Sequence, residues 1–502
     1  MDTSQWTAVE KGTIMTHGNH LWRRIASGVV GSLGLLLGGA PASAQTPATQ
    51  PAAREAVESI ATRQEVEKKP APYQSKAWGA RLETEPPGYV KSLKDHGLPG
   101  GEDINWFDLG LEHRTRFEHR DDDLRRPRLE EDDQFLLRSR AYFGVREILD
   151  PFRFAVEFQD SRQFNSDWPE TNRDVNENDF LQAFGELYFK DALGPGQPLA
   201  LRAGRMTLDL IDRHTVGRNR WNNTTNAFDG FRLRLGEASS DWQFDFFAVQ
   251  PVDRRMRRPD RGDEERWFYG LVGTWRKWHR YITLEPYYFI LDEDRRGWEA
   301  ADREIHTMGL HVFGPIAGTN FDYDVNAAMQ FGEDGERRQR AFAAMGELGY
   351  TVEHAWKPRL SGSLMGASGD RDPNDHFSER FGRCFDPAHP YSTWDLITWQ
   401  NVISPKMRLE LKPTDKLRFD TSYGGYWLAS DSDAWVATGR RDPFGGSGDF
   451  LGQEVDVRVR YQLHQRVDLE VGYTHFFAGP FAQNTGPADD ADFLYVQTTL
   501  RL

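Results

Sequence analysis

Residues 103–502 consist of short segments in which apolar and polar side chains alternate. Examples are residues 233–235, 455–461 and the closing stretch 493–502. A strand with lipid on one side and water on the other must alternate in this way. In lipid, such strands satisfy their backbone hydrogen bonds only by closing into a barrel. The pattern predicts an all-β fold, a transmembrane antiparallel β-barrel.

The connections between these segments alternate between short and long. Residues 194–196 and 236–241 form short turns, whereas residues 253–266 and 292–303 are long and charged. Outer-membrane barrels have short periplasmic turns and long outer loops, an alternation that a soluble β-sandwich does not need. The predicted segments are 180–190, 199–207, 228–235, 242–250, 267–275, 281–291 and 304–313.

The length of this region sets the number of strands. A spanning strand of about 9 to 11 residues, with its share of turn and loop, takes roughly 22 residues. Residues 103–502 therefore predict about 18 strands, with about 16 as the alternative. A barrel of this size is too wide for its own side chains to fill, so we expect a channel.

The N-terminus has the features of a secretory signal peptide. Arg23 and Arg24 precede the apolar run 25–38, and residues 42–44 form an A-x-A cleavage site. The run is shorter than the about 20 apolar residues of a spanning helix, which disfavours a membrane anchor. We predict a signal peptide over residues 1–44, with either Met1 or Met15 as the start.

Residues 45–102 differ in composition from the region that follows. Residues 46–53 are rich in Ala, Pro, Gln and Thr, and residues 54–69 suit one short charged helix. Prolines punctuate the rest of the stretch. Such a composition buries too little apolar surface to fold alone. We predict a largely disordered periplasmic linker over residues 45–102, with partner binding by residues 52–69 as the alternative, and the barrel over 103–502.

The parity of each segment assigns its two faces. In residues 109–120, Leu109 and Phe117 share the parity that faces lipid, whereas Glu112 and Glu118 share the other. The same rule applied to the other segments gives an inner wall that is rich in arginine. The arginines assigned to the lumen are Arg114, Arg116, Arg138, Arg140, Arg153, Arg202, Arg232, Arg234, Arg408, Arg418, Arg458 and Arg460.

Two interpretations of this wall compete. In the first, arginines pair with Glu and Asp and merely brace a water-filled barrel. In the second, surplus arginines form a positive constriction that selects anions, because a low-dielectric wall focuses their field on the permeant species. Taken as a set, the arginines favour anion passage.

Overall composition excludes several other classes of protein. The net charge of −15 argues against general affinity for nucleic acid. The single cysteine, Cys384, permits no internal disulfide. The mean hydropathy of −0.69 is that of a soluble chain, but the alternating strands of a barrel escape such averages.

Aromatic residues collect near segment ends. They are Trp267, Phe268, Tyr269, Trp275, Trp278, Tyr287, Tyr288, Phe289, Tyr423, Tyr426, Trp427, Phe476 and Phe477. Amphipathic rings prefer the level of the lipid headgroups, so we interpret them as interface girdles. Platforms for stacking sugar rings are the alternative.

Several ordered blocks of the barrel region resemble the bacterial alginate-export outer-membrane porins. The first lie at residues 204–208, 221–224, 228–233 and 247–252, and further ones at 347–350, 358–360, 367–375 and 385–391. The residues that carry the first three blocks are Gly204, Arg205, Trp221, Asn223, Phe228, Asp229 and Gly230. Two positions depart from the family: Met206, where Gln is usual, and the C-terminal Leu502, where Phe is usual.

The resemblance implies an 18-stranded barrel that passes a polyuronate chain, alginate or a similar polymer, outward through an electropositive lumen. It also implies loops that occlude the pore, for which residues 367–391 are our candidate. The expected partners are an anionic polysaccharide, outer-membrane lipid and lipopolysaccharide, the barrel-assembly machinery and a periplasmic export scaffold, with no nucleic acid. The expected location is the outer membrane of a Gram-negative bacterium.

Two other functions share parts of this pattern. An uptake porin, general or substrate-specific, has the same fold and charged lumen. A barrel-embedded enzyme needs a nucleophile, a base and an orienting group, and no G-x-S-x-G motif flanks His214, His354, His389 or His475. We expect no catalytic residues, no cofactor and no metal site, although the acidic runs 121–123 and 130–133 have the ligand chemistry of calcium.

Overall fold

The computed structural model of the chain describes residues 73–126, 129–294, 302–385, 387 and 389–502. The predicted signal peptide, residues 1–44, and residues 45–72 of the predicted linker lie outside these ranges. The described residues from 73 to 502 belong to one compact unit. The barrel and the described part of the linker therefore belong to the same folded body.

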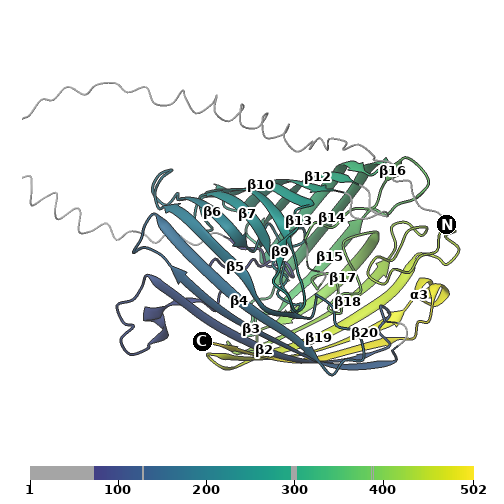
Figure 1. Cartoon of the computed structure of the whole chain (residues 1–502). Coiled ribbons are helices and arrows are strands. Elements are labelled where there is room, and N and C mark those ends of the chain that lie inside the picture. Colours follow the sequence, from purple (N-terminus) through teal and green to yellow (C-terminus); the bar gives the residue numbers. More distant parts are fainter. Residues whose placement is uncertain (1–72, 127–128, 295–301, 386, 388) are drawn as a thin grey trace, which may run out of the picture. The chain divides into compact units, whose positions relative to one another are not determined.

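Eighteen strands of the described residues pair in one closed antiparallel ring, which closes where β2 pairs with both β3 and β21 (Figure 1). This confirms the predicted fold and strand number. Nine of the ring strands are β2 (Phe107–Asp121), β3 (Glu131–Val145), β4 (Phe152–Phe164), β5 (Asn176–Phe189), β6 (Leu199–Met206), β7 (Phe228–Leu235), β8 (Trp242–Asp253), β10 (Arg266–His279) and β11 (Ile282–Glu293). The other nine are β12 (Arg303–Pro315), β13 (Phe321–Asp334), β14 (Arg337–Thr351), β15 (Arg359–Ala367), β17 (Val402–Leu411), β18 (Leu417–Trp427), β19 (Phe450–His464), β20 (Val467–Ala478) and β21 (Ala491–Arg501).

A few short elements lie outside the ring. They are β1 (Lys91–Ser92), the 3-10 helix η1 (Leu93–His96), β9 (Arg261–Gly262), β16 (Phe377–Ser378) and the helix α3 (Pro480–Thr485). Among the described residues, no helix has the length and apolar composition needed to cross a lipid bilayer.

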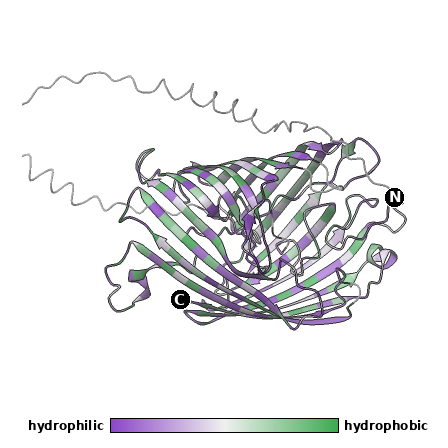
Figure 2. Ribbon diagram, viewed as in Figure 1, coloured by the Kyte–Doolittle hydropathy of each residue, from purple (hydrophilic) through white to green (hydrophobic). Residues whose placement is uncertain are grey.

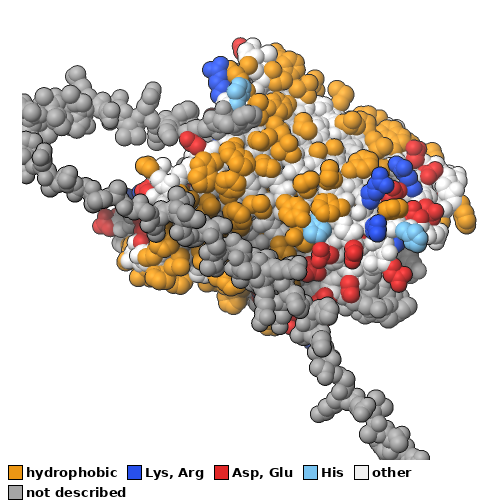
Figure 3. All heavy atoms as spheres, turned by 90° about the horizontal axis from the view of Figure 1, so that it is seen from above, with side chains coloured by type: hydrophobic (Ala, Val, Ile, Leu, Met, Phe, Trp, Pro, Cys, Tyr) orange, Lys and Arg blue, Asp and Glu red, His pale blue; other side chains and the backbone are white. Residues whose placement is uncertain are grey.

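The two faces of the wall differ as the alternation predicts. In β2 every second residue from Asp108 to Arg120 is buried, and apolar and polar positions alternate along the strands (Figure 2). Large apolar side chains such as Phe231, Phe342 and Leu364 are exposed on the outside, and hydrophobic side chains spread over the outer wall (Figure 3). Lipid on one side and a polar interior on the other account for this division.

The ends of the barrel also differ. Short turns join β7 to β8 (236–241), β10 to β11 (280–281) and β19 to β20 (465–466) at one end. At the other end, β6 leads to β7 through 207–227 and β15 leads to β17 through 368–401. The short-turn end corresponds to the periplasmic side of an outer-membrane barrel. One connection at the long-loop end, 335–336 between β13 and β14, is short.

The hydrophobic core of the protein lies inside the ring. The 207–227 loop contributes Leu208 and Val216, and the 368–401 loop contributes Trp394 and Trp399, all of them at most 2% exposed. The two loops bond to each other, since the amide of Gly217 donates to the carbonyl of Phe385 (3.1 Å). The interior is therefore occupied by folded loops rather than by an open bore.

The described part of the predicted linker, residues 73–102, differs from a disordered tether. β1 pairs with the start of β2, where Ser92 lies opposite Asp108. The His96 ring nitrogen Nε2 lies 2.9 Å from the carbonyl oxygen of Leu109. Composition did not reveal this order, because the segment folds on the barrel wall rather than alone.

Candidate functional site

The predicted lumen arginines occupy different environments. Seven are buried on the inner side of the wall: Arg114, Arg116, Arg138, Arg140, Arg202, Arg232 and Arg408. Four are partly buried: Arg153, Arg234, Arg458 and Arg460. Arg418 shares the face of buried Asp420 but is exposed at the short-turn end of β18. Their role as a substrate path stays a prediction.

A first group of arginines, on β2 and β3, holds the 207–227 loop. Arg114 and Arg116 donate to the carbonyl oxygen of Trp221 at 2.9 and 2.8 Å. Arg138 donates to the carbonyl oxygen of Asn222 at 3.0 Å. Guanidinium groups that bond backbone carbonyls satisfy the loop's polar groups inside the barrel. These arginines therefore position the loop as well as supplying charge.

The side chain of Trp221 connects the wall to both inner loops. Its ring stacks on that of His389 in the 368–401 loop, with centroids 4.0 Å apart and planes at 9°. The Arg116 guanidinium lies 3.9 Å from the Trp221 centroid. A cation on one side and an aromatic ring on the other fix the indole in place.

The other family-motif residues fasten the same loop at its ends. Asn223 is fully buried and donates to the carbonyl oxygens of Leu137 and Asp174 at 3.0 and 2.8 Å. Arg205 and Asp229 form a two-bonded ion pair, with distances of 2.8 and 2.9 Å. The family-motif residues thus hold the 207–227 loop in place. The spacing of these residues in the sequence did not indicate this structural role.

Two motif glycines face each other where β6 and β7 pair. Gly204 (φ +123°) lies opposite Gly230 (φ +155°). A Cβ atom on Gly230 would lie 2.3 Å from the carbonyl oxygen of Ala248, and one on Gly204 would lie 2.4 Å from that of Ala183. Only glycine suits both positions. The remaining motif residue, Phe228, is fully buried against Phe268 and Phe385.

A second group of arginines meets a carboxylate from the N-terminal segment. Arg232, Arg202 and Arg234 place guanidinium nitrogens 2.6, 2.9 and 3.2 Å from the Glu85 carboxylate. Burial alone would raise the pKa of the Glu85 carboxyl, but the three guanidiniums, Arg232 first, hold that pKa well below its ordinary value. Glu85 is therefore ionised at neutral pH.

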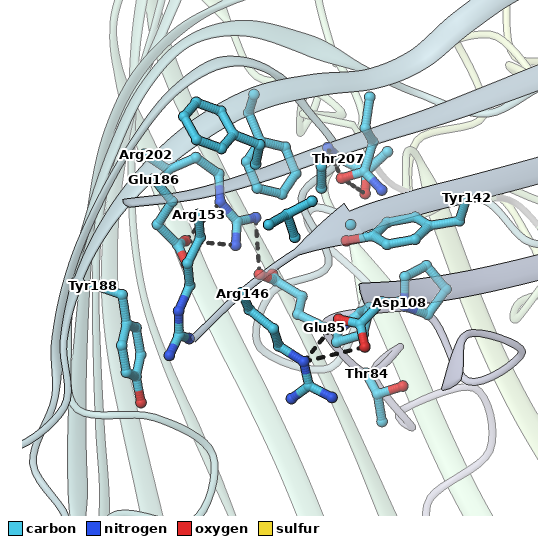
Figure 4. Close-up of a pocket in the computed structure, with 18 of the residues that line it drawn as sticks. Thr84, Glu85, Asp108, Tyr142, Arg146, Arg153, Glu186, Tyr188, Arg202 and Thr207 are labelled. Carbon is cyan, nitrogen blue, oxygen red and sulfur yellow. Dashed lines mark hydrogen bonds and ion pairs between the residues drawn. The ribbon is translucent and has the colours of Figure 1, made fainter. Parts of the chain in front are cut away.

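A cavity of about 580 Å³ opens beside Glu85 at the short-turn end (Figure 4). Its wall carries Arg146, which pairs with Asp108 at 2.9 Å, and Arg153, whose guanidinium lies 3.4 Å from the centroid of the Tyr188 ring. The volume is within the range of small-ligand pockets. The sequence assigned Arg153 to the lumen but gave no indication of the cavity, since it had no signal for the segment that borders it.

A third group of arginines shares one carboxylate. Asp420 on β18 lies 3.4 Å from Arg408, 3.1 Å from Arg458 and 3.2 Å from Arg460. The indole of Trp78 lies between Arg408 and Arg458, at 3.5 and 4.3 Å from its centroid. Arg458 also lies 3.6 Å from Glu470, so three guanidiniums meet two carboxylates in this group.

The interior beside β11, β12 and β13 is acidic. His311 on β12 lies 2.8 Å from Glu285 through Nδ1 and 3.1 Å from Asp324 through Nε2. Asp212, His311 and Asp324 bring ligand atoms within 4.8 Å of one another, a group with the donor types of a metal site. Both ring nitrogens of His311 already face carboxylates, so charge pairing accounts for the group. It escaped notice in the sequence because its members are far apart along the chain.

The girdle interpretation is wrong for five of the aromatic residues. Phe268, Tyr287, Phe289, Tyr426 and Phe476 are at most 3% exposed and pack inside the barrel. Their neighbours Tyr423 and Phe477 are exposed on the outer wall, as girdle residues would be. The inner loops supply apolar partners, so alternate aromatic positions face inward.

Comparison with known proteins identifies the family. The family model described as "Alginate export" matches residues 105–496. The chain belongs to the alginate export family. Membership makes the protein a transport channel of the Gram-negative outer membrane rather than an enzyme. A comparison with curated proteins gave no match for this alginate export family member.

Solved structures share the fold of this alginate export family member. Pseudomonas aeruginosa OccK11 (OpdR) matches with a TM-score of 0.53 at 16% identity, over 84% of this chain and 98% of its own. OpdQ from the same organism matches with 0.55 at 13%, over 79% and 98%. The outer membrane protein OpdK of P. aeruginosa matches with 0.54 at 10%, over 79% and 98%.

Proposed function

We propose that the protein passes an anionic polysaccharide, alginate or a similar polyuronate, outward across the outer membrane. Membership of the alginate export family supports a polysaccharide cargo. The proposed path runs past the inward arginines, whose guanidiniums bond carboxylates in pairs. The periplasmic export scaffold remains part of this proposal.

The proposal rests on one observation: several wall arginines share a single carboxylate. Asp420 serves Arg408, Arg458 and Arg460. Glu112 likewise lies within 3.1 to 3.7 Å of Arg138, Arg140 and Arg501. Arg138, Arg408 and Arg460 have only the shared carboxylate within salt-bridge distance among the described residues. Arg140, Arg458 and Arg501 each reach a second carboxylate. The surplus of positive charge supports anion selection, because charge in a low-dielectric wall focuses the field in the pore.

Uptake of smaller anions is the second candidate. The fold is shared with the outer membrane protein OpdK, and a passive pore conducts in either direction. Export and uptake can therefore use the same pore wall. They differ in the side of the membrane from which the substrate enters. Polymer block from the periplasmic side favours export.

Reversal potentials in planar bilayers test the proposal. Arg458→Ala combined with Arg460→Ala removes two cations beside Asp420, and we expect it to weaken anion selectivity and block by polymannuronate. Arg258→Ala combined with Arg261→Ala, on an exposed outer loop, makes the same change of charge away from the path. Cation selectivity of the natural protein, or equal effects of the two double variants, would contradict the proposal.

A further inference from the structure

Residues 73–92, which we term the inner segment, cross the barrel from one wall to the opposite one. Near its start, Lys76 lies 3.4 Å from Asp322 on β13, and Trp78 lies between arginines of β17 and β19. Glu85 reaches β6 and β7, which lie halfway round the ring from β18. The segment therefore spans the interior in the half of the barrel near the short-turn end.

The middle of the inner segment also contacts the 207–227 loop. The amide of Glu83 donates to Asp209 at 2.6 Å, and Arg213 donates to the carbonyl oxygen of Gly79 at 3.1 Å. Gly79 (φ +80°) has no room for a Cβ, which would lie 2.8 Å from Pro390 of the 368–401 loop. The segment thus packs against both inner loops.

The far end of the inner segment is anchored more firmly than its middle. The Tyr89 hydroxyl donates to Glu157 at 2.6 Å, and both residues are buried. Val90 approaches β2 so closely that a Cβ on Gly110 would lie 2.9 Å from it. By contrast, Glu83 and Glu85 border the open cavity of about 580 Å³. The contacts of Trp78 and Glu85 are the ones that can break without disturbing this anchor.

The groups that the inner segment uses are those that a uronate would use. Glu85 offers one carboxylate to three guanidiniums, with oxygens 2.6, 2.9 and 3.2 Å from their nitrogens. A hexuronate unit carries the same carboxylate, and guanidiniums bind carboxylates by charge-assisted hydrogen bonds. The adjoining cavity has the volume for such a unit, and its lining carries both arginines and carboxylates. Arg146 and Arg153 there pair with Asp108 and Asp150.

We propose that the inner segment blocks the pore by occupying the arginines of β6, β7, β17 and β19. The segment must withdraw before an anionic polymer binds these arginines, so the segment and the polymer compete for them. The block concerns ions as well as polymer. The competition with polymer rests on the proposed function, whereas the block itself does not. Tyr89 and β1 stay on the wall and act as the pivot.

Two single variants test the block from opposite ends of the segment. Glu85→Gln keeps the shape but removes the charge that three guanidiniums share, and Trp78→Ala removes the ring between Arg408 and Arg458. Loss of a charge-assisted bond at Glu85, or of the cation–π contacts at Trp78, shifts an equilibrium by about tenfold. We therefore expect each variant to raise the open fraction of single channels in potassium chloride by about that factor. Glu102→Gln, an exposed carboxylate outside the inner segment, is the matched control.

The outcomes separate the two proposals. Folded variants, shown by natural mobility on unboiled gels, that conduct no more than the natural protein would overturn the block. A higher open fraction together with tighter polymannuronate block supports both the block and the competition. A higher open fraction with unchanged polymannuronate affinity would overturn the competition. A higher open fraction with no response to polymannuronate in any variant would overturn the proposed function and leave the block in place.

Discussion

The Glu85 carboxylate lies 2.6 Å from the guanidinium of Arg232, although 147 residues separate the two along the chain. The contact joins the segment ahead of the barrel to the inner wall of β7. Arg232 also pairs with Asp245 at 2.6 Å, so Glu85 supplies a second carboxylate to an arginine that the wall already neutralises. Arg234, further along β7, lies 3.2 Å from Glu85. Withdrawal of Glu85 would leave Arg234 without a carboxylate within salt-bridge distance among the described residues. Arg202 would keep its pair with Glu186 at 2.8 Å.

The lowered pKa of Glu85 predicts how pH affects the channel. When the inner segment docks on the wall, the pKa of the Glu85 carboxyl falls below its ordinary value of 4.5. The ionised carboxylate therefore stabilises the docked state at pH values above 4.5, and this stabilisation is lost as the pH falls through the lowered pKa. We expect the open fraction to be flat between about pH 5 and about pH 8 and to rise below about pH 4.5.

Single-channel recording over this pH range checks the prediction. In Glu85→Gln the acid-dependent rise due to this group should disappear, because the amide does not titrate. Glu102→Gln controls for the loss of a carboxylate elsewhere. An identical acid response in Glu85→Gln and in the natural protein would show that Glu85 does not govern the docking.

The backbone at Gly230 predicts a strong effect of a single methyl group. Gly230→Ala places a Cβ 2.3 Å from the carbonyl oxygen of Ala248 at φ +155°, which costs about 1–3 kcal/mol in backbone strain alone. We expect a lower yield of folded barrel and a lower thermal unfolding temperature in detergent.

Gly362→Ala on β15 is the matched control, because nothing lies within 4 Å of its Cβ position. It should unfold like the natural protein or slightly higher, since alanine restricts the unfolded chain. Equal unfolding temperatures for the two alanine variants would contradict the strain assigned to the β6–β7 pair.

The stack at Trp221 predicts the mobility of the 207–227 loop. Trp221→Ala removes an aromatic pair and a cation–π contact, together worth roughly 1–3 kcal/mol. We expect amide hydrogen exchange in residues 207–227 to quicken by about tenfold per 1.4 kcal/mol lost. Trp356→Ala, in the exposed turn between β14 and β15, should leave that exchange unchanged. Unaltered exchange in Trp221→Ala would show that the stack does not hold the loop.

The barrel was predictable because membrane strands obey a strict rule. The predicted segment 228–235 coincides with β7, and within it Phe231 is 58% exposed whereas Arg232 is 4% exposed. Lipid and a polar interior impose this alternation on each strand independently. The sequence of each strand is therefore enough to predict which of its side chains face lipid and which face the interior.

The contents of the barrel were not predictable in the same way. Phe268 and Phe289 were interpreted as girdle residues, yet both are buried, because inner loops from distant parts of the chain cover them. Trp78 and Glu85 stand in a proline-rich stretch with no periodicity. Single contacts with wall arginines order that stretch, and such contacts leave no pattern along the sequence.

Release of polymer from liposomes tests the central claim most directly. Vesicles containing the purified protein would be loaded with fluorescent polymannuronate or with a neutral oligosaccharide of equal length. The account predicts that the uronate escapes faster than the neutral chain, and that Arg458→Ala with Arg460→Ala reduces this difference. Equal escape of both chains, or retention of the uronate while the neutral chain leaves, would contradict it.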